Sequence, residues 1–307
     1  MNILIFGGTG FIGSALVEAL SAQGDECHVV TRRANGLVGG KAQYHTWDGH
    51  DIQQVVSLMD SADAIVNLAG ETIGKWPWST THKQRVIQSR VRIGQQIASV
   101  FTNGMLPTKK DRVYIQSSGV GYYGNSAQPN MDEMAPAGSD FLAHVAQEWE
   151  ASTSVLDNVA GIRRCVIRTS LVLGRDAGAL PMMALPVRFF AGGPLGDGNQ
   201  GVSWIHIDDE VNAIIYLVKT PSCKGVFNFS APQPVTNKHF MQVLARVLHR
   251  PSWLPAPAFA LRLALGEMST LLLDGQYAWP KALLDNGYIF RYPTIEAALM
   301  DLYKKEA

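Results

Sequence analysis

The chain begins with an apolar strand, a glycine-rich turn and an amphipathic helix, in that order. Its first twenty residues read MNILIFGGTGFIGSALVEAL. In such a turn Gly7 adopts unusual backbone angles, Gly10 lets a phosphate approach the backbone, and Gly13 lets the helix pack close to the sheet. The helix N-terminus then presents unpaired N–H groups and the positive end of its dipole. The segment therefore predicts a dinucleotide site with the pyrophosphate lying on the first helix.

Strand-like apolar runs alternate with helical patterns through the first two thirds of the chain. Such alternation predicts an α/β fold, in which a Rossmann-type doubly wound parallel sheet is covered on both faces. The expected strands are residues 2–6, 26–31, 64–68, 113–117, 164–172 and 225–230. The expected helices are residues 14–23, 81–103, 141–158 and 208–219, the last with Asp208 as its N-cap.

Two regions rich in glycine and proline interrupt this alternation. They are residues 174–201 and the tail after Ser230, which contains five prolines between residues 232 and 257. We predict a nucleotide-binding domain at residues 1–230, of which residues 174–205 contribute to a smaller substrate lobe. Residues 231–307 then form the C-terminal part of that lobe.

Charge and cysteine content narrow the class of partner. Lys plus Arg equals Asp plus Glu at 26 each, so no overall field attracts the chain to nucleic acid or to an anionic membrane, and neither is expected as a partner. Cys27, Cys165 and Cys223 match neither a zinc spacing nor a disulfide framework. The chain opens directly on a strand and contains no long apolar run, so we expect a cytoplasmic protein without a bound metal.

The end of the second strand indicates which dinucleotide is bound. In this fold an acidic residue there accepts the ribose 2′-OH of NAD, whereas an arginine suits the 2′-phosphate of NADP. Here the strand ends at Thr31 and is followed by Arg32 and Arg33. Because a guanidinium pairs with phosphate through two parallel charged hydrogen bonds, we predict NADP, with Arg32 as the phosphate ligand. Solvated loop arginines are the alternative, above all for Arg33.

Several motifs in order resemble one family. They are GGTGFIG at 7–13, NLAG at 67–70, SS at 117–118 before YYG at 122–124, and WIHIDD at 204–209. Together they resemble the extended short-chain dehydrogenase/reductases, within the NAD-dependent epimerase/dehydratase superfamily. A further set of motifs resembles the atypical subgroup called epimerase family proteins, which has its own C-terminal region of unknown function. These motifs are GE at 70–71, SR at 89–90, RTSLVLG at 168–174, GGPLG at 192–196 and, in the tail, GEM, GQ, PK and GY.

The resemblance implies positions for the cofactor. Gly7, Thr9, Gly10, Phe11, Ile12 and Gly13 would surround the pyrophosphate, Thr31 and Arg32 the 2′-phosphate, and Leu68 and Ala69 the adenosine and ribose. Gly70 and Glu71 follow at the same strand end, and Glu71 would touch cofactor or substrate. Arg90, with Arg85, would reach the cofactor from the helix after that strand. Thr169, Ser170 and Leu171 would lie near the nicotinamide.

The catalytic residues depart from the family pattern. Extended relatives use a Ser together with a Tyr-x-x-x-Lys pair for proton transfer. Ser118 matches the serine, but the helix that should carry the pair reads DFLAHVAQEW at 140–149. One alignment places Leu142 and Ala146 at the two positions and the other Phe141 and Val145, so neither supplies a proton donor. Tyr122, Tyr123 and His144 are the available substitutes, although ring packing for the tyrosines and a solvent-facing position for His144 stay open.

Two functional interpretations follow. The first is an NADP-dependent oxidoreductase or epimerase acting on a small hydroxy- or keto-containing molecule, such as a sugar nucleotide. The second is a non-catalytic NADP-binding sensor or scaffold that has lost the acid–base pair. His206, Asp208 and Asp209 are read as capping and packing residues rather than metal ligands. Extended relatives often dimerise through the helices predicted at 81–103 and 141–158, so a homodimer is possible.

Overall fold

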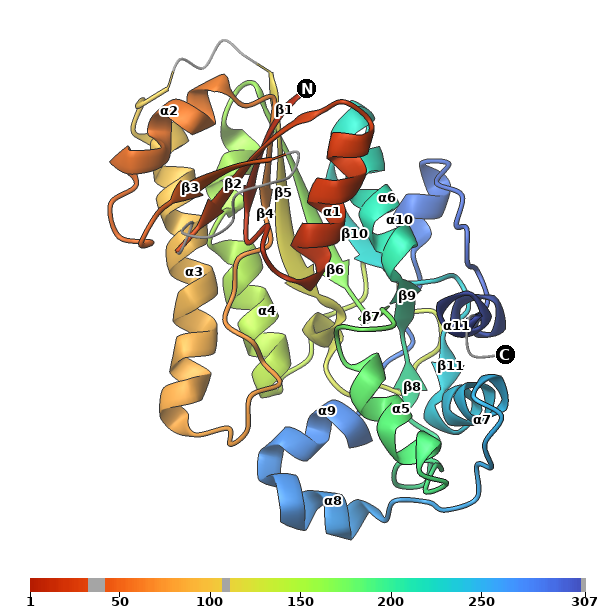
Figure 1. Cartoon of the computed structure of the whole chain (residues 1–307). Coiled ribbons are helices and arrows are strands. Elements are labelled where there is room, and N and C mark those ends of the chain that lie inside the picture. Colours follow the sequence, from red (N-terminus) through yellow and green to blue (C-terminus); the bar gives the residue numbers. More distant parts are fainter. Residues whose placement is uncertain (33–41, 107–110, 305–307) are drawn as a thin grey trace.

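A seven-stranded parallel sheet forms the centre of the molecule (Figure 1). The computed structural model describes residues 1–32, 42–106 and 111–304. The strand order is β10-β6-β5-β4-β1-β2-β3. Their bounds are β1 Asn2–Phe6, β2 Glu26–Thr31, β3 Ala42–Thr46, β4 Ala64–Asn67, β5 Arg112–Gly119, β6 Ile162–Thr169 and β10 Gly225–Phe229. The predicted doubly wound fold is confirmed.

Helices cover both faces of the sheet, and the side chains of β1 show why. Ile3 and Ile5 point into one apolar core, shared with the first group of helices below. Leu4 and Phe6 point into a second core on the other face, because successive side chains of a strand alternate between faces. The first core is covered by α1 (Phe11–Ala22), α6 (Ile207–Lys219) and α10 (Lys281–Asp285). The second is covered by α2 (Gln53–Ser61) and α3 (Thr80–Thr102), beside which α4 (Phe141–Ala151) packs.

Parallel pairing brings the ends of the strands to one edge. Phe6 of β1 lies level with Val30 of β2 and with Asn67 of β4. Strands β2 and β3 follow β1 in sequence and lie on one side of it in the sheet. Strand β4 lies on the other side of β1, and β5, β6 and β10 continue the sheet in that direction. Such a switch point, at the carboxyl ends of the strands, is where parallel α/β sheets bind ligands.

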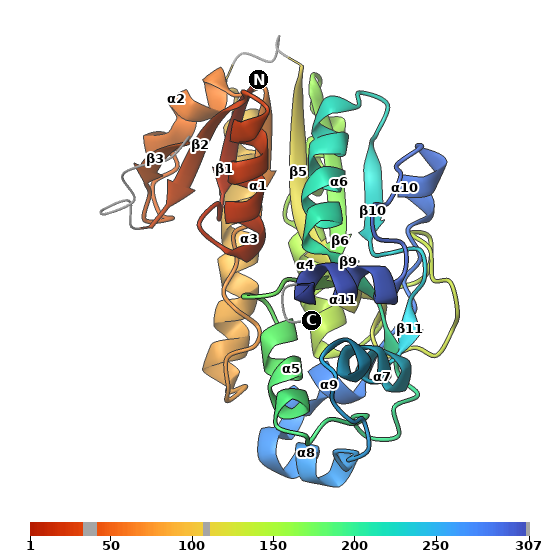
Figure 2. The same ribbon diagram turned by 45° about the vertical axis from the view of Figure 1, so that its right-hand side comes forward.

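A smaller lobe lies beyond this edge, at the lower end of the molecule in Figures 1 and 2. Its own core combines α5 (Leu180–Arg188), α7 (Asn237–Val247) and α11 (Ile295–Tyr303) with the buried Trp204. The remaining elements are β7 Leu171–Leu173, β8 Gly201–Val202, β9 Trp204–His206, β11 Val235–Thr236, α8 Ala258–Leu265, α9 Thr270–Leu273 and the 3₁₀ turns η1 Val120–Tyr123, η2 Ser154–Asn158 and η3 Gly266–Ser269. Among the helices of the described ranges, none combines the length and the apolar character needed to cross a bilayer.

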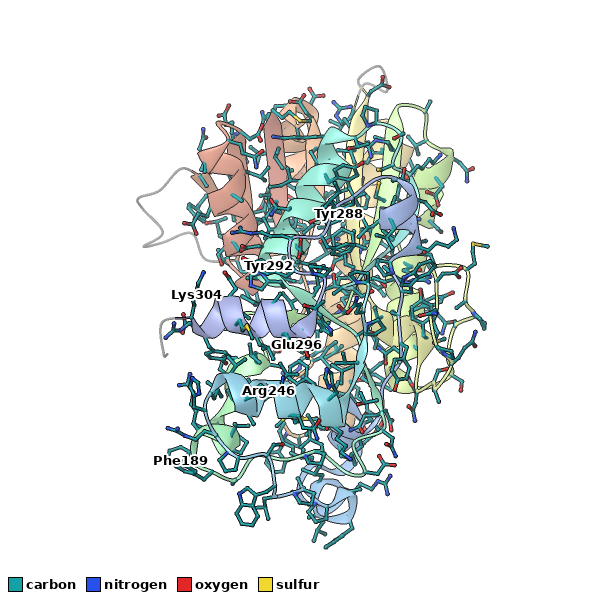
Figure 3. The ribbon with its side chains drawn as sticks, turned by 90° about the vertical axis from the view of Figure 1, so that its right-hand side faces the viewer. Phe189, Arg246, Tyr288, Tyr292, Glu296 and Lys304 are labelled. Carbon is teal, nitrogen blue, oxygen red and sulfur yellow. The ribbon has the colours of Figure 1, made fainter. Side chains whose placement is uncertain are left out.

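Part of the tail returns to the sheet. Tyr288 packs into the apolar core under α6 and donates a hydrogen bond from its hydroxyl to the Asp209 carbonyl (3.0 Å), and Figure 3 shows it beside α6 well above the lobe. The division of the chain at residue 230 stays a prediction. The structure adds that the segment around α10 covers one face of the sheet.

Several elements differ from the sequence-based expectation. The expected strand 164–172 is two strands, because Ser170 turns its N–H and hydroxyl to the Phe229 carbonyl (3.0 and 2.7 Å) and β7 then pairs with β9. The expected helix 141–158 ends at Ala151 and is followed by η2. Strand β3 and helix α2 were not expected. β3 is a half-exposed edge strand without an apolar run, and α2 has only two buried residues.

The cap of α6 also differs. Asp208 was expected as the N-cap, but the helix begins at Ile207 and the cap is His206, whose Nδ1 accepts from the Asp208 N–H (3.0 Å). His206 is buried, and its ring lies 4.0 Å from that of Tyr292. A histidine therefore provides the acceptor that an aspartate or serine usually supplies. No group of three potential metal ligands occurs in the parts of the chain that the structure describes.

Candidate functional site

The glycine-rich turn has the geometry of a phosphate cradle. Gly7 has φ +81°, and a Cβ on it would lie 2.8 Å from the Leu68 carbonyl carbon. A Cβ on Gly13 would lie 2.6 Å from the Gly8 Cα. Gly10 is the N-cap of α1 and offers no side chain to its first turn, so the first N–H groups of the helix have no partner within it. The backbone around Gly7 and Gly13 leaves no room for side chains, and the first amides of α1 are uncapped. Both features suit an anion bound at this position.

The loop after β4 is fixed directly beside this turn. The Leu68 N–H donates to the Phe6 carbonyl (2.9 Å), and the Ala69 N–H donates to the Asn67 side-chain oxygen (3.2 Å). Asn67 is fully buried, so this turn has little freedom. Leu68 and Ala69, predicted to contact the adenosine and ribose, thus border the phosphate turn.

The predicted 2′-phosphate ligands end the neighbouring strand. Thr31 is the last residue of β2 and is half-buried, and Arg32 follows it with its side chain exposed. Arg33 lies outside the described residues. Thr31 and Arg32 therefore stand at the same sheet edge as the turn, one strand away from it.

Arg90 is a buried cation at this edge. Its side chain is 6 % exposed, and Nη1 donates to the Glu71 and Val86 carbonyls (both 2.9 Å). Its guanidinium lies 4.7 Å from the Trp149 ring and would be 3.0 Å from a Cβ on Gly70. Burial lowers the pKa of Arg90 to about 10.

The Glu71 charge acts on Arg90 and raises its pKa against the larger effect of burial. No ion pair joins Arg90 to a carboxylate among the described residues, and its buried Nε lacks a hydrogen-bond partner there. A buried charge without a counter-ion is costly, so the site is suited to an anionic ligand that neutralises it. Arg85, predicted to assist, is exposed on the same helix.

Ser118 is held by an ion pair that the sequence did not reveal. Its hydroxyl donates to Glu150 Oε1 (2.7 Å). Arg168 donates to both oxygens of the same carboxylate, Nε to Oε1 at 2.8 Å and Nη2 to Oε2 at 2.9 Å. Burial alone disfavours the charged guanidinium, but the hydrogen bonds and charge of Glu150 outweigh it and raise the pKa of Arg168. The Ser118 proton is therefore directed at a carboxylate rather than at the open edge.

Both tyrosine rings lie against the same guanidinium, with centroids 3.4 Å (Tyr122) and 5.2 Å (Tyr123) from Arg168 Cζ. Tyr123 is 3 % exposed, accepts from Arg168 Nη1 (3.0 Å) and donates to the Asn228 side-chain oxygen (2.7 Å). Burial raises its pKa to about 12, against the lowering effect of Arg168. The Tyr122 ring stacks on Arg168, 3.4 Å from centroid to Cζ, and is half-buried. Its hydroxyl makes no hydrogen bond to any described residue.

On helix α4, apolar residues occupy the positions where the Tyr-x-x-x-Lys pair was expected. Leu142 lies against η1, where a Cβ on Gly121 would approach its Cβ to 3.2 Å. Ala146 is buried one turn further along the same face, and Glu150 follows after another turn. Phe141 instead packs on Trp78 (5.2 Å between centroids). His144 is exposed to solvent.

The end of β6 is fixed by a buried acid. Thr169 donates to Glu210 Oε1 (2.8 Å), and the other Glu210 oxygen has no partner among the described residues. Complete burial raises the pKa of Glu210 to about 8, against the hydrogen bond from Thr169. Ser170 and Leu171 are held through their N–H groups by the Phe229 and Ser203 carbonyls. Thr169, Ser170 and Leu171 thus form a rigid segment at the sheet edge.

Three charged residues of this region were not predicted as site residues: Glu150, Arg168 and Glu210. A signal for Glu150 exists in the sequence, since it follows Leu142 and Ala146 at helical spacing of four. Arg168 and Glu210 give none, because each looks like an ordinary charged residue until the strand order places it beside Ser118 or Thr169.

A phosphate-binding turn at the switch point of a parallel sheet, with a smaller lobe beyond the strand ends, defines a dinucleotide-binding protein of the extended short-chain dehydrogenase type. The chain belongs to the NAD dependent epimerase/dehydratase family, whose model matches residues 3–229. Residues 256–302 match a domain of unknown function (DUF1731). The resemblance inferred from the sequence motifs is confirmed.

Relatives match over the whole chain. An epimerase family protein of Bacillus subtilis, YfhF, is 38 % identical over 306 residues, which cover 98 % of each chain. The crystal structure of the human epimerase family protein SDR39U1 with NADPH has a TM-score of 0.87 at 32 % identity and covers 99 % of each chain. The Thermus thermophilus UDP-glucose 4-epimerase in complex with NAD shares the fold, with a TM-score of 0.76 at 17 % identity over the full length of both chains.

Proposed function

We propose that the protein is an NADP-dependent oxidoreductase or epimerase that acts on a small hydroxy- or keto-containing substrate. The cradle of Gly7 and Gly13 carries the proposal, because its geometry is built for a pyrophosphate. Arg32 after β2 favours the 2′-phosphate of NADP, and the human relative was solved with NADPH. A sugar nucleotide is a candidate substrate, and a cytoplasmic location and a homodimer stay predictions.

Bound NADP would supply or accept a hydride at the carbon that changes oxidation state. The chain's own residues would hold the cofactor: the amides of α1 at the pyrophosphate and Arg90 as a buried counter-charge near the loop after β4. Thr169 and its neighbours would border the nicotinamide end.

Proton transfer needs a different group from that of the extended family. Ser118 is bonded to Glu150, and Tyr123 has its hydroxyl engaged by Asn228 and Arg168. The Tyr122 hydroxyl makes no hydrogen bond to any described residue, and Tyr122 lies within η1, which directly follows β5. We therefore assign the proton donor or acceptor to Tyr122, with Arg168 fixing its ring.

A second function has its own support. The absence of Tyr-x-x-x-Lys on α4, together with the commitment of the Ser118 proton to Glu150, favours a non-catalytic NADP-binding sensor or scaffold. General acid–base assistance contributes about 10²–10⁴ in rate, so a site that has lost it would bind the cofactor without appreciable turnover.

The two functions are separated by one set of measurements. NADPH fluorescence is titrated with protein, and NADPH oxidation is then followed with a panel of aldehydes, ketones and keto sugars. For an enzyme we expect Tyr122→Phe to lower turnover by about 10²–10⁴ without changing NADPH affinity. The matched variant Tyr123→Phe should leave turnover closer to wild type. An epimerase gives no net NADPH oxidation, so epimerisation of sugar nucleotides is followed as well, with NADP present. Binding with neither carbonyl reduction nor epimerisation favours the sensor, and no binding of NADPH refutes both.

A further inference from the structure

Exposed apolar side chains are concentrated at one end of the lobe. We call this surface the lobe tip and define it as residues 180–195 and 249–265. It contributes eight of the sixteen large apolar side chains that are exposed in the described parts of the chain. These eight are Met182, Leu185, Phe189, Phe190, Trp253, Leu254, Phe259 and Leu263, between 45 and 87 % exposed. So dense a patch marks an interaction surface.

Backbone hydrogen bonds make the lobe tip one continuous surface. The N–H groups of Trp253 and Leu254 both donate to the Gly192 carbonyl (3.0 Å). The indole N–H of Trp253 donates to the Phe190 carbonyl (3.1 Å). The two segments are therefore joined side by side, and Figure 3 shows Phe189 at the lower end of the molecule.

Helix α8 completes the lobe tip in an unusual way. Its sequence is AFALRLAL, yet it contains no buried residue. A helix that is apolar all round is normally buried in a core or in lipid. Figures 1 and 2 show α8 at the lower extremity of the molecule, protruding below α5 and α4. The apolar side chains of α8 therefore lie at an extremity of the molecule.

The charge of the lobe tip has one sign. The sequence contains no Asp or Glu between Glu210 and Glu267, and none between Asp176 and Asp197. The tip itself carries Arg188, Arg250 and Arg262, and the Arg250 guanidinium lies 4.7 Å from the Phe190 ring.

The first two acidic residues that follow α8 in the sequence bond to residues of the first half of the chain and not to the lobe tip. Glu267 pairs with Lys83 at the start of α3, and Asp274 accepts from Asn125 (3.4 Å). Basic and apolar groups therefore share the tip, with no acidic residue in either of its segments.

We propose that the lobe tip docks onto the surface of a bilayer that contains anionic lipids. Its Phe, Trp and Leu side chains would enter the boundary between headgroups and acyl chains, while the arginines contact the phosphates. A second copy of the chain fits less well, because a two-fold interface buries the same surface of both copies, and neither tip has an acidic residue to pair with the arginines of the other. The balanced net charge had argued against a membrane partner, but it averages over the whole surface and conceals this acid-free end.

Vesicle flotation with the full-length protein tests the proposal. Vesicles of phosphatidylcholine alone are compared with vesicles of equal parts phosphatidylcholine and phosphatidylglycerol, at low and high salt. We expect wild type to float only with the anionic vesicles and to be released by salt. The double variant Phe259→Ser/Leu263→Ser should bind about 100-fold more weakly, from the apolar area that it removes, and Arg262→Gln about five-fold.

Two controls distinguish docking from a general change in the protein. Ile289→Ser and Met134→Ser remove apolar side chains that are 88 and 90 % exposed outside the lobe tip, and both variants should float like wild type. NADPH affinity and melting temperature should stay unchanged in all variants. Wild type that does not float with anionic vesicles overturns the proposal, as does a double variant that floats like wild type. Sedimentation in which only the double variant loses a dimer would assign the tip to a second copy instead.

Discussion

The Glu150–Arg168 pair offers a sharp test of how the sheet edge around Ser118 is held together. Both side chains are buried, 13 and 4 % exposed, and the carboxylate receives two hydrogen bonds from Arg168 and one from Ser118. Replacing Glu150 by Ala leaves the guanidinium with two acceptors among the described residues, the Tyr123 hydroxyl (3.0 Å) and the Glu133 carbonyl (3.3 Å). The variant therefore leaves the buried positive charge of Arg168 without its counter-ion.

The size of the effect follows from this burial. Removing one partner of a buried ion pair costs about 3–5 kcal/mol, because the other charge is left uncompensated. The unfolding entropy near the midpoint is about 2.1 cal/mol/K per residue, which for 307 residues converts that loss into a melting point lower by about 5–8 °C. Glu150→Gln keeps an acceptor for one hydrogen bond and should lose about half as much.

Scanning calorimetry at neutral pH measures the shift. Glu148→Ala is the matched control, since Glu148 is exposed on the same helix, and it should change the melting point by about 1 °C or less. A double-mutant cycle with Arg168→Ala should give a coupling energy of about 2–3 kcal/mol. If Glu150→Ala melts within 2 °C of wild type, the pair does not hold the edge as described.

Three further predictions concern the cofactor cradle and pH. Gly13→Ala should abolish measurable NADPH binding in a fluorescence titration, because its Cβ meets fixed backbone at 2.6 Å. Gly74→Ala, whose Cβ meets nothing within 4 Å, should bind normally. Equal affinities of the two variants would contradict the assignment of the glycine turn as a phosphate cradle. Arg90→Met should weaken NADPH binding by about 10- to 100-fold, the worth of a hydrogen bond to a charged group, and an unchanged Kd in calorimetric titration would show that Arg90 serves only the Glu71 loop. Burial raises the pKa of Glu210 to about 8 in the folded state, whereas the unfolded state releases the same proton near pH 4.5. The folded state therefore binds more protons between these values, and the free energy of unfolding falls as pH rises from about 5 to 8. Glu210→Gln should remove this slope and stabilise the protein at pH 9 by ~5 kcal/mol, from a pKa raised from 4.5 to about 8. Parallel melting curves against pH for both proteins would refute the assignment.

The sequence predicted the elements whose signal is local. Strand β1, the glycine-rich turn and helix α1 were all expected, because apolar period and glycine placement act within a few residues. The helix begins at Phe11 rather than at the predicted Ser14, so Gly13 lies in its first turn. Helix α3 was expected within one residue at each end. The edge strand β3 was missed, because a half-exposed strand carries no continuous apolar run. The break at Ser170 was also missed, since its acceptor is Phe229, 59 residues away.

For the site, the sequence placed the cofactor residues along the chain but not the partners that fix them. It identified Ser118 and the missing Tyr-x-x-x-Lys, yet it did not show that the serine hydroxyl would donate to Glu150 or that Arg168 would pair with that carboxylate. The pairing of β5 with β6 sets Ser118 beside Arg168, and α4 then brings Glu150 over both.

By itself the sequence determined the fold class, the phosphate turn, the family and the absence of the usual acid–base pair, because each depends on residue type and short-range spacing. The tertiary structure alone decided which buried charges meet and which apolar side chains remain uncovered. Buried pairing depends on strand order and helix packing, which join residues far apart in the chain. Exposure is likewise a property of the folded surface, since AFALRLAL reads in sequence as a core helix and only its place at the lobe tip leaves it in solvent.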